Sequence, residues 1–301
     1  MGPLPAIPEE VWALFDEIGP RWRENVSGHV KMVCEALTPV LKLAPKDGIE
    51  VHTVSYGPHE RQAFEVFTPP SAGKLRPALL FVHGGAFVEG SRNRTDEIYS
   101  NVLNFAASNG IVGINVGYRL APDAIWPEAS KDIGTVVRWA ASHAEELGVD
   151  PARIFLMGHS AGGAHVASWA YDKRVHGGEG HGLAGLIVAS GRVRADNLPE
   201  NPNARKVEAY YGTDASIFDD RSPVTHVTAD SVPTLVTWSE FENPLMDLYC
   251  SELVHRLAQA KRRGPPVVYC PRHNHTSTVA QINTADDLLG PAILDFIDNP
   301  R

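Results

Sequence analysis

The pattern of hydrophobic and polar positions divides the chain into an N-terminal helical region and a longer region in which strands and helices alternate. Residues 1–48 carry apolar side chains at helical spacing, which predicts amphipathic helices. Farther along, short apolar runs predict strands, and longer stretches with helical periodicity separate them. The expected strands are 63–68, 78–82, 111–116, 154–157, 183–189, 234–237 and 267–269, and the expected helices are 128–147, 160–171, 245–262 and 286–298.

This alternation predicts an α/β fold with a mostly parallel central sheet flanked by helices, because strands joined through helices form right-handed crossovers. Residues 191–230 interrupt the alternation, since they contain no convincing strand and many polar, Pro and Asn residues. We predict that this insertion and the helical segment 1–48 form a helical cap on an α/β domain of residues 49–301.

Composition and charge narrow the set of partners. The 301 residues are 43% hydrophobic, enough for a sizeable core, and 27 Lys+Arg against 36 Asp+Glu give a formal net charge of −9. A negative protein repels phosphate backbones and anionic headgroups, so we expect neither nucleic acid nor a membrane as a partner. The sequence has no apolar run of about 18 residues, no signal-peptide pattern, and only three scattered cysteines. We therefore expect a cytoplasmic protein.

The sharpest chemical signal is Gly-His-Ser-Ala-Gly-Gly at residues 158–163, which follows a predicted strand and precedes a predicted helix. This is the strand–turn–helix context of a G-x-S-x-G nucleophile elbow. Its glycines let the strand and the helix approach closely around a strained serine, and the helix N-terminus favours negative charge there. Ser160 is therefore the candidate nucleophile.

A second glycine-rich loop, His-Gly-Gly-Ala-Phe at residues 83–87, follows the predicted strand 78–82. Consecutive glycines leave backbone N–H groups unobstructed, and a loop of this type completes an oxyanion hole together with the residue after the nucleophile. The predicted oxyanion hole consists of the N–H groups of Gly84, Gly85 and Ala161.

Together with Tyr-Arg-Leu-Ala-Pro at 118–122, these motifs resemble the hormone-sensitive-lipase-like branch of the α/β-hydrolases. The resemblance implies a carboxylesterase with a Ser/acid/His triad, no metal or organic cofactor, and a helical cap. The chain departs from many members at two positions: Ala86 replaces a third glycine, and His159 replaces an aspartate. The Gly-His-Ser-Ala-Gly form also resembles arylformamidases, so both ester and amide substrates stay open.

The chain order Ser, acid, His requires the base near the C-terminus. His273 and His275 lie between the expected strand 267–269 and the last helix. Similar sequences place the base just ahead of that helix, so His275 is the predicted base and His273 the alternative. A metal site at this His-x-His pair is disfavoured, because no Cys, Asp or Glu stands at ligand spacing nearby.

The acid is expected on the loop after strand 234–237, where family members usually carry G-x-x-D. Counting from the strand places Glu242 at the acid position, whereas counting back from Pro-Leu at 244–245 places Asn243 there. An amide cannot supply the charge that stabilises an imidazolium, so Glu242 is preferred, with Asp247 second and Glu240 third. Glutamate is chemically adequate, since Ser/His/Glu triads occur on this fold.

The resulting hypothesis is a serine carboxylesterase that hydrolyses small to medium acyl or aryl esters through an acyl-enzyme, without a cofactor or metal. One alternative is an amidase or arylformamidase with the same triad. A more remote one is a non-catalytic ligand receptor, a class that has typically lost a triad member. Arg192 and Arg194, which could reach a substrate carboxylate, are interpreted as solvated loop residues. The expected partner is a small-molecule ester, and a homodimer is a further expectation.

Overall fold

The central element of the fold is an eight-stranded sheet. The computed structural model describes residues 2–70 and 75–301, and within them the strand order is β1-β2-β4-β3-β5-β6-β7-β8. β2 pairs antiparallel with both β1 and β4, and every pair from β4 to β8 is parallel. The strands are β1 Glu50–Ser55, β2 Ala63–Thr68, β3 Arg76–Val82, β4 Val112–Val116, β5 Val149–His159, β6 Gly185–Ala189, β7 Thr234–Phe241 and β8 Val267–Asn274.

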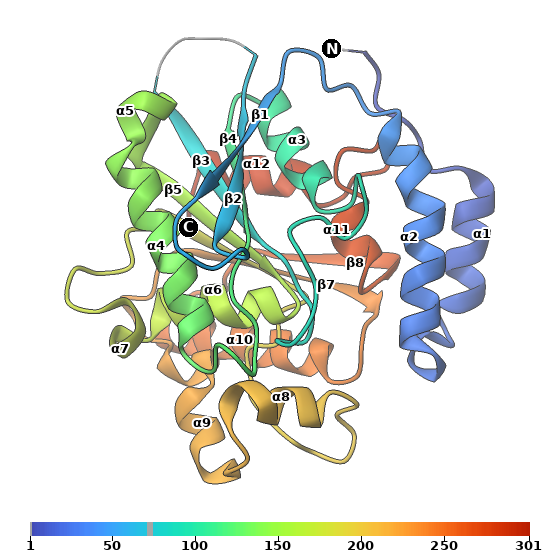
Figure 1. Cartoon of the computed structure of the whole chain (residues 1–301). Coiled ribbons are helices and arrows are strands. Elements are labelled where there is room, and N and C mark those ends of the chain that lie inside the picture. The colour runs from blue at the N-terminus through green and yellow to red at the C-terminus, as the bar shows by residue number, and fades with distance from the viewer. Residues whose placement is uncertain (1, 71–74) are drawn as a thin grey trace.

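Helices cover both faces of this sheet (Figure 1). The helices are α1 Glu9–Ile18, α2 Val26–Lys42, α3 Ser100–Ser108, α4 Glu128–Ser142, α5 Ala144–Leu147, α6 Ala161–Tyr171, α7 Lys173–His176, α8 Ala204–Tyr211, α9 Phe218–Arg221, α10 Met246–Lys261, α11 Ser277–Ala280 and α12 Gly290–Asp298. Three short 3₁₀ turns occupy Trp22–Glu24, Ala215–Ile217 and Pro223–His226. The predicted fold, a mostly parallel sheet flanked by helices, is confirmed.

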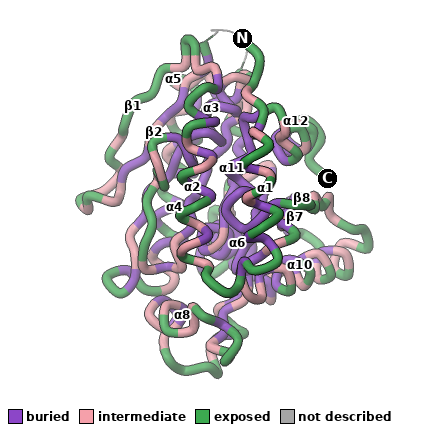
Figure 2. Tube along the Cα trace, turned by 90° about the vertical axis from the view of Figure 1, so that its right-hand side faces the viewer, coloured by how far each residue is buried: buried purple, intermediate pink, exposed green. Residues whose placement is uncertain are grey.

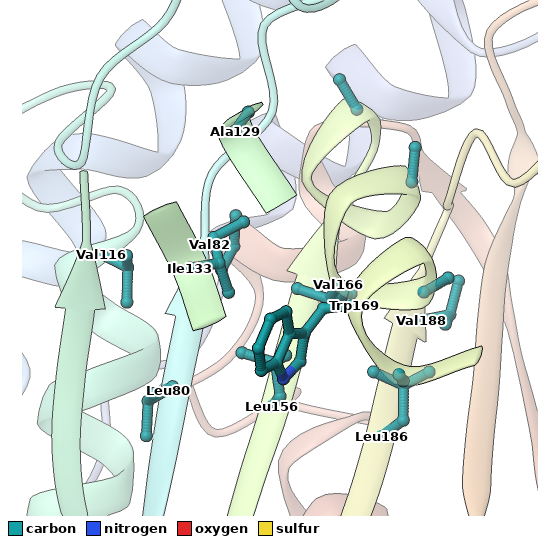
Figure 3. Packing of buried hydrophobic residues seen from close by; sticks show 14 of the residues in the cluster. Leu80, Val82, Val116, Ala129, Ile133, Leu156, Val166, Trp169, Leu186 and Val188 are labelled. Atoms are coloured by element: carbon teal, nitrogen blue, oxygen red, sulfur yellow. The ribbon is translucent and has the colours of Figure 1, made fainter. Parts of the chain in front are cut away.

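The sheet separates two hydrophobic cores. In β3, Leu80 and Val82 belong to the core that includes residues of α4, α6 and α10, whereas Leu79 and Phe81 belong to the core that includes residues of α1, α2, α3 and α12. Figure 3 shows the first of these cores, with Trp169 of α6 packed among the apolar side chains of the strands. Burial on both faces explains why these strands are continuous apolar runs rather than alternating ones.

β1 and α3 are two of the elements that had no clear signal in the sequence. β1 is an edge strand with mostly exposed residues, so it lacks an apolar face (Figure 2). α3 has the opposite character, because eight of its nine residues are buried and Asn101 and Asn104 are among them. Asn101 is accommodated there because its side-chain amide donates to the carbonyls of Val279 and Ile282 at 2.9 and 2.8 Å. Neither element shows the amphipathic pattern on which the prediction depended.

The two segments predicted to form a cap lie on different sides of the sheet. α1 and α2 form an antiparallel pair beside β8 and α11 (Figure 1). The insertion 191–230 contains no strand among the described residues, as expected, and it contributes α8 and α9 to the fold. Val207, Tyr210 and Tyr211 of α8 reach into the core that contains α6. Within the described ranges, no helix is both long enough and apolar enough to cross a bilayer.

Candidate active site

The candidate residues gather at the carboxyl ends of neighbouring parallel strands. The glycine-rich loop follows β3, Ser160 follows β5, Glu242 follows β7 and His275 follows β8. Because parallel strands end at the same edge of a sheet, side chains that are far apart in the chain meet there. The topology therefore brings the sequence-predicted residues to one edge of the sheet.

The β5–α6 turn has the geometry of a strained elbow. Ser160 adopts φ 57° and ψ −120°, a combination that residues with a side chain rarely adopt. The flanking glycines are required by close backbone contacts. A Cβ on Gly158 would lie 2.4 Å from the carbonyl oxygen of Gly162, and one on Gly162 would lie 2.3 Å from that of Val82. The glycines of the motif thus allow β3, β5 and α6 to meet around the serine.

The loop after β3 lies directly against Ser160. A Cβ on Gly84 would lie 2.9 Å from the Cβ of Ser160. Gly85 has φ +142°, and a Cβ there would collide with the carbonyl oxygen of Glu89. Within the described ranges, the amides of Gly84, Gly85 and Ala161 have no hydrogen-bond acceptor. Three free donors around one hydroxyl form an arrangement that can bind an oxyanion.

His83 and Tyr118 hold this loop in place. The His83 ring donates from Nδ1 to the carbonyl oxygen of Gly84 at 2.7 Å and stacks on Tyr118 with ring centroids 4.4 Å apart. The Tyr118 hydroxyl donates to the carbonyl of His83 at 2.8 Å. Burial lowers the pKa of His83 to about 3, so this ring is neutral, and its contacts hold the loop in one conformation. His83 and Tyr118, which both belong to sequence motifs, therefore have structural roles beside the site.

Glu242 and His275 form a buried pair. The imidazole donates from Nδ1 to Oε2 of the carboxylate at 2.6 Å, and both side chains are almost fully buried. Burial alone would raise the pKa of Glu242. His275 and the hydrogen bonds from His275, Ser190 and Ser239 outweigh that effect, so the pKa lies below its usual value. Because the hydrogen of the neutral imidazole stays on Nδ1, facing this carboxylate, Nε2 of His275 is the nitrogen that can accept a proton.

The other candidates for acid and base lie elsewhere. Asp247 is partly exposed and pairs with Arg23 at 3.4 Å, and Glu240 is exposed and accepts from the backbone N–H of Arg272 at 2.7 Å. His273, two residues before His275 on β8, packs edge-on against Trp12 of α1 with ring centroids 5.2 Å apart. Of the weighed alternatives, only Glu242 and His275 are brought into contact.

The two arginines interpreted as solvated loop residues have ion-pair partners. Arg192 is buried, in contrast to the expectation, and its guanidinium lies 3.7 Å from Asp196. Arg194 pairs with Asp219 at 2.9 Å and with Glu252. The interpretation of Arg192 as solvated is therefore wrong, because the folded insertion surrounds it with polar partners.

Two serines at the site had no motif in the sequence. Ser190, directly after β6, donates to Oε1 of Glu242 at 2.5 Å, and the backbone N–H of Ser239 donates to the same oxygen at 2.9 Å. The sequence offered one signal, since Ser190 stands at the carboxyl end of a predicted strand. Its contact with Glu242, which is 52 residues away in the chain, required the tertiary structure.

His159 also joins the site from behind the nucleophile. Its Nε2 donates to the backbone carbonyl of His275 at 2.9 Å, and its Nδ1 accepts from the Tyr99 hydroxyl at 3.3 Å. Burial lowers the pKa of His159 well below its usual value, and the charge of His275 acts in the same direction. A neutral histidine therefore bridges the elbow and the segment that carries the candidate base.

A cavity of about 720 Å³ opens above these residues. Ser160, His275 and Gly85 line it, residues 23–30 from the 3₁₀ turn before α2 and the start of α2 form one wall, and residues 199–206 before and within α8 form another. Its volume is in the range of small-molecule sites. The described residues contain no group of three or more His, Cys, Asp and Glu side chains arranged to hold a metal ion.

Comparisons with known proteins agree with this fold. Residues 64–177, which include the glycine-rich loop and the elbow, match the BD-FAE family model. Esterase LipC of Mycobacterium tuberculosis is 30% identical over 239 residues, covering 74% of this chain and 58% of the relative. An ethyl acetate hydrolase of Pseudomonas putida is 37% identical over 124 residues, covering 41% of this chain and 35% of the relative. The chain thus spans about a third to three fifths of these two relatives' lengths.

A solved esterase structure covers nearly the whole chain. The esterase of Pyrobaculum calidifontis superposes with a TM-score of 0.72 at 21% identity, over 97% of this chain and 98% of that one. At this identity the likeness establishes the fold. The comparisons confirm the resemblance to esterases of the α/β-hydrolase fold that the sequence motifs indicated.

Proposed function

From the α/β-hydrolase fold of this chain, we propose that the protein is a serine carboxylesterase that hydrolyses small to medium acyl or aryl esters through an acyl-enzyme. One observation carries the proposal. Nδ1 of His275 lies 2.6 Å from the buried carboxylate of Glu242, and Ser160 and His275 line the same cavity. The names of the relatives, which are esterases and an ethyl acetate hydrolase, favour esters over amides as substrates.

In the proposed acylation step, Ser160 Oγ attacks the ester carbonyl while Nε2 of His275 accepts the hydroxyl proton. The charge on Glu242 stabilises the imidazolium and holds the tautomer in which Nδ1 carries hydrogen. The N–H groups of Gly84, Gly85 and Ala161 stabilise the negative oxygen of the tetrahedral intermediate. The imidazolium then donates its proton to the leaving alcohol, and an acyl-Ser160 ester forms.

Deacylation repeats this sequence with water as the nucleophile. His275 takes a proton from the water, which attacks the acyl carbon, and then returns the proton to Ser160 Oγ as the carboxylic acid leaves. The segments predicted to form a cap, 1–48 and 191–230, supply two walls of the cavity above Ser160. Their position supports the predicted cap. The cytoplasmic location and the homodimer stay predictions.

The test is hydrolysis of p-nitrophenyl acetate, butyrate and octanoate by the wild type and three variants. We expect Ser160→Ala and Glu242→Gln each to lower kcat by about 10⁴-fold or more, because both residues act in one catalytic unit. Asp247→Asn is the matched control at an acidic residue outside the pair, and we expect a change of less than about threefold.

Each outcome bears on a separate part of the proposal. Full activity in Ser160→Ala would refute the acyl-enzyme mechanism. A large loss in Asp247→Asn with activity kept in Glu242→Gln would reassign the acid. Turnover of N-formylkynurenine by a wild type that cleaves none of the esters would replace the esterase with an arylformamidase.

A further inference from the structure

One charged side chain in the cavity, Arg94, forms no ion pair with any described residue. Arg94 lies in the loop between β3 and α3 and is exposed to the cavity that contains Ser160. No carboxylate lies within 4.0 Å of its guanidinium in the described part of the chain. The neighbouring thiol of Cys34 stays neutral, because burial raises its pKa. Glu89 attracts this guanidinium from a longer distance, but Glu89 is already paired with Lys206. The guanidinium of Arg94 therefore has no carboxylate of a described residue in direct contact.

The other two cations that line the cavity are paired. Arg23 contacts Asp247 at 3.4 Å, and Lys206 contacts Glu89 at 2.5 Å. Glu200 also lines the cavity and is exposed. With Asp247 counted as the partner of Arg23, three cations at the cavity face three carboxylates, and of these cations Arg94 alone has no carboxylate within 4.0 Å in the described ranges. The cation that has no direct carboxylate partner favours an anionic group of a ligand at this place in the cavity.

The guanidinium of Arg94 is held before any ligand arrives. Its Nε donates to the Tyr99 hydroxyl at 3.1 Å, and its Cζ lies 5.4 Å from the centroid of the Tyr99 ring. These contacts use one edge of the group and leave the terminal nitrogens for another acceptor. A fixed, planar guanidinium binds a carboxylate through two parallel hydrogen bonds at a smaller entropic cost than a free side chain.

The same tyrosine ties Arg94 to the reacting centre. The Tyr99 hydroxyl, which accepts from Arg94, donates to Nδ1 of His159, and His159 directly precedes Ser160 in the elbow. A single tyrosine and one histidine thus separate the guanidinium from the nucleophile. A carboxylate bound at Arg94 belongs to a molecule small enough to place its ester carbonyl at Ser160 within the same cavity.

We propose that Arg94 is a specificity-determining residue that binds a carboxylate on the substrate, so that the preferred substrates are esters carrying a free carboxylate. This inference rests on the proposed esterase function and names the substrate class of that site. The carboxylate can belong to the acid part, as in a monoester of a dicarboxylic acid, or to the alcohol part, as in an acylated hydroxy acid. Both are bound by the same contact.

The test uses two pairs of esters. In each pair one compound has a free carboxylate, and in the other compound that carboxylate is blocked as a methyl ester. Monomethyl adipate against dimethyl adipate probes the acid part, and 4-acetoxybenzoate against methyl 4-acetoxybenzoate probes the alcohol part. For each pair the measured quantity is the ratio of kcat/KM for the acid to kcat/KM for its methyl ester. General effects of a substitution on catalysis cancel in this ratio.

We expect Arg94→Gln to lower this ratio at least 10-fold in one pair, which also identifies the part that carries the carboxylate. Arg94→Lys keeps the charge but loses the planar fork, so it is expected to lower the ratio less. Arg153→Gln is the control. It removes the same charge at a residue outside the cavity, which pairs with Asp298, and it is expected to leave the ratio unchanged.

An unchanged ratio in both Arg94 variants and in both pairs would overturn the inference. Continued hydrolysis of the neutral methyl esters would in that case leave the proposed esterase function intact. If the wild type hydrolysed none of the four compounds, the function and the inference would both fail. Arg94→Lys keeps the test decisive if Arg94→Gln does not fold.

Discussion

At the scale of single residues, the orientation of the candidate acid depends on side chains that do no chemistry themselves. Oε1 of Glu242 accepts from the Ser190 hydroxyl and from the Ser239 backbone, and Oε2 accepts from His275. A buried carboxylate with all three donors is fixed in one rotamer. Removing one donor from a buried charged group costs about 1.5–3 kcal/mol.

We therefore expect Ser190→Ala to lower kcat about 10-fold with little change in KM, because Glu242 loses a donor while the cavity stays the same. Ser239→Ala is the matched control. Its backbone N–H still donates to Glu242, and its hydroxyl bonds to Asn274 and Thr278 instead. Steady-state kinetics on p-nitrophenyl butyrate measures both variants. Equal losses in the two would contradict a specific role for the Ser190 hydroxyl.

At the scale of elements, the close packing of α6 against the backbone that follows β6 determines where the nucleophile lies. Gly163, the last glycine of the motif, allows this approach, because a Cβ there would lie 2.6 Å from the Cα of Gly191. Gly191 follows Ser190, so the same contact links the elbow to the residue that holds Glu242. The contact is between backbones, and a small shift of a side chain cannot relieve it.

We expect Gly163→Ala to destabilise the protein by about 1–3 kcal/mol, although alanine favours helices over glycine by about 1 kcal/mol, because the overlap outweighs the helix propensity. Urea unfolding measures the change in free energy, and esterase activity is expected to fall with it. Gly264→Ala is the control, since a Cβ on Gly264 would meet no atom within 4 Å. A stabilised Gly163→Ala protein would show that α6 moves freely, against this interpretation.

At the scale of the whole molecule, buried histidines couple folding to pH. Burial lowers the pKa of His83 and of His165 to about 3 and that of His273 to about 4. Below pH 6.5 these groups take up protons in the unfolded chain while they stay neutral in the folded one. The unfolded state then binds more protons, so stability falls as the pH falls.

Between pH 7 and pH 5 each such histidine is expected to reduce the free energy of unfolding by about 2 kcal/mol. Asp287 opposes this, because burial raises its pKa to about 6 and its protonation favours the folded state by about 1 kcal/mol over the same interval. The three histidines together outweigh it. The protein is therefore expected to lose stability on acidification through this range.

His165→Leu isolates one of these contributions. Both ring nitrogens of His165 are buried without a hydrogen-bond partner among the described residues, so leucine leaves no donor or acceptor unpaired. We expect the loss of stability between pH 7 and pH 5, measured by urea unfolding at each pH, to shrink by about 2 kcal/mol in this variant. His52→Leu, at an exposed position on β1, is the control. Equal pH dependence in wild type and His165→Leu would contradict this account.

The same division by scale describes how far the sequence could predict this protein. The parallel strands, the elbow around Ser160 and the loop of Gly84 and Gly85 were predictable, because each depends on backbone geometry within a few consecutive residues. β1 and α3 were not, because one exposes nearly every residue and the other buries nearly every residue. Hydrophobic periodicity identifies elements with one buried face, and neither of these has one.

The sequence by itself determined the α/β class, the candidate nucleophile and the candidate oxyanion donors. Only the tertiary structure decided which carboxylate contacts which imidazole. Glu240, Glu242 and Asp247 all carry carboxylates, and their surroundings depend on their positions relative to the end of β7. The tertiary structure also decided that Arg94 faces the cavity while Arg192 does not. Such contacts join residues far apart in the chain, and their energies depend on burial and distance that no local pattern of residues encodes.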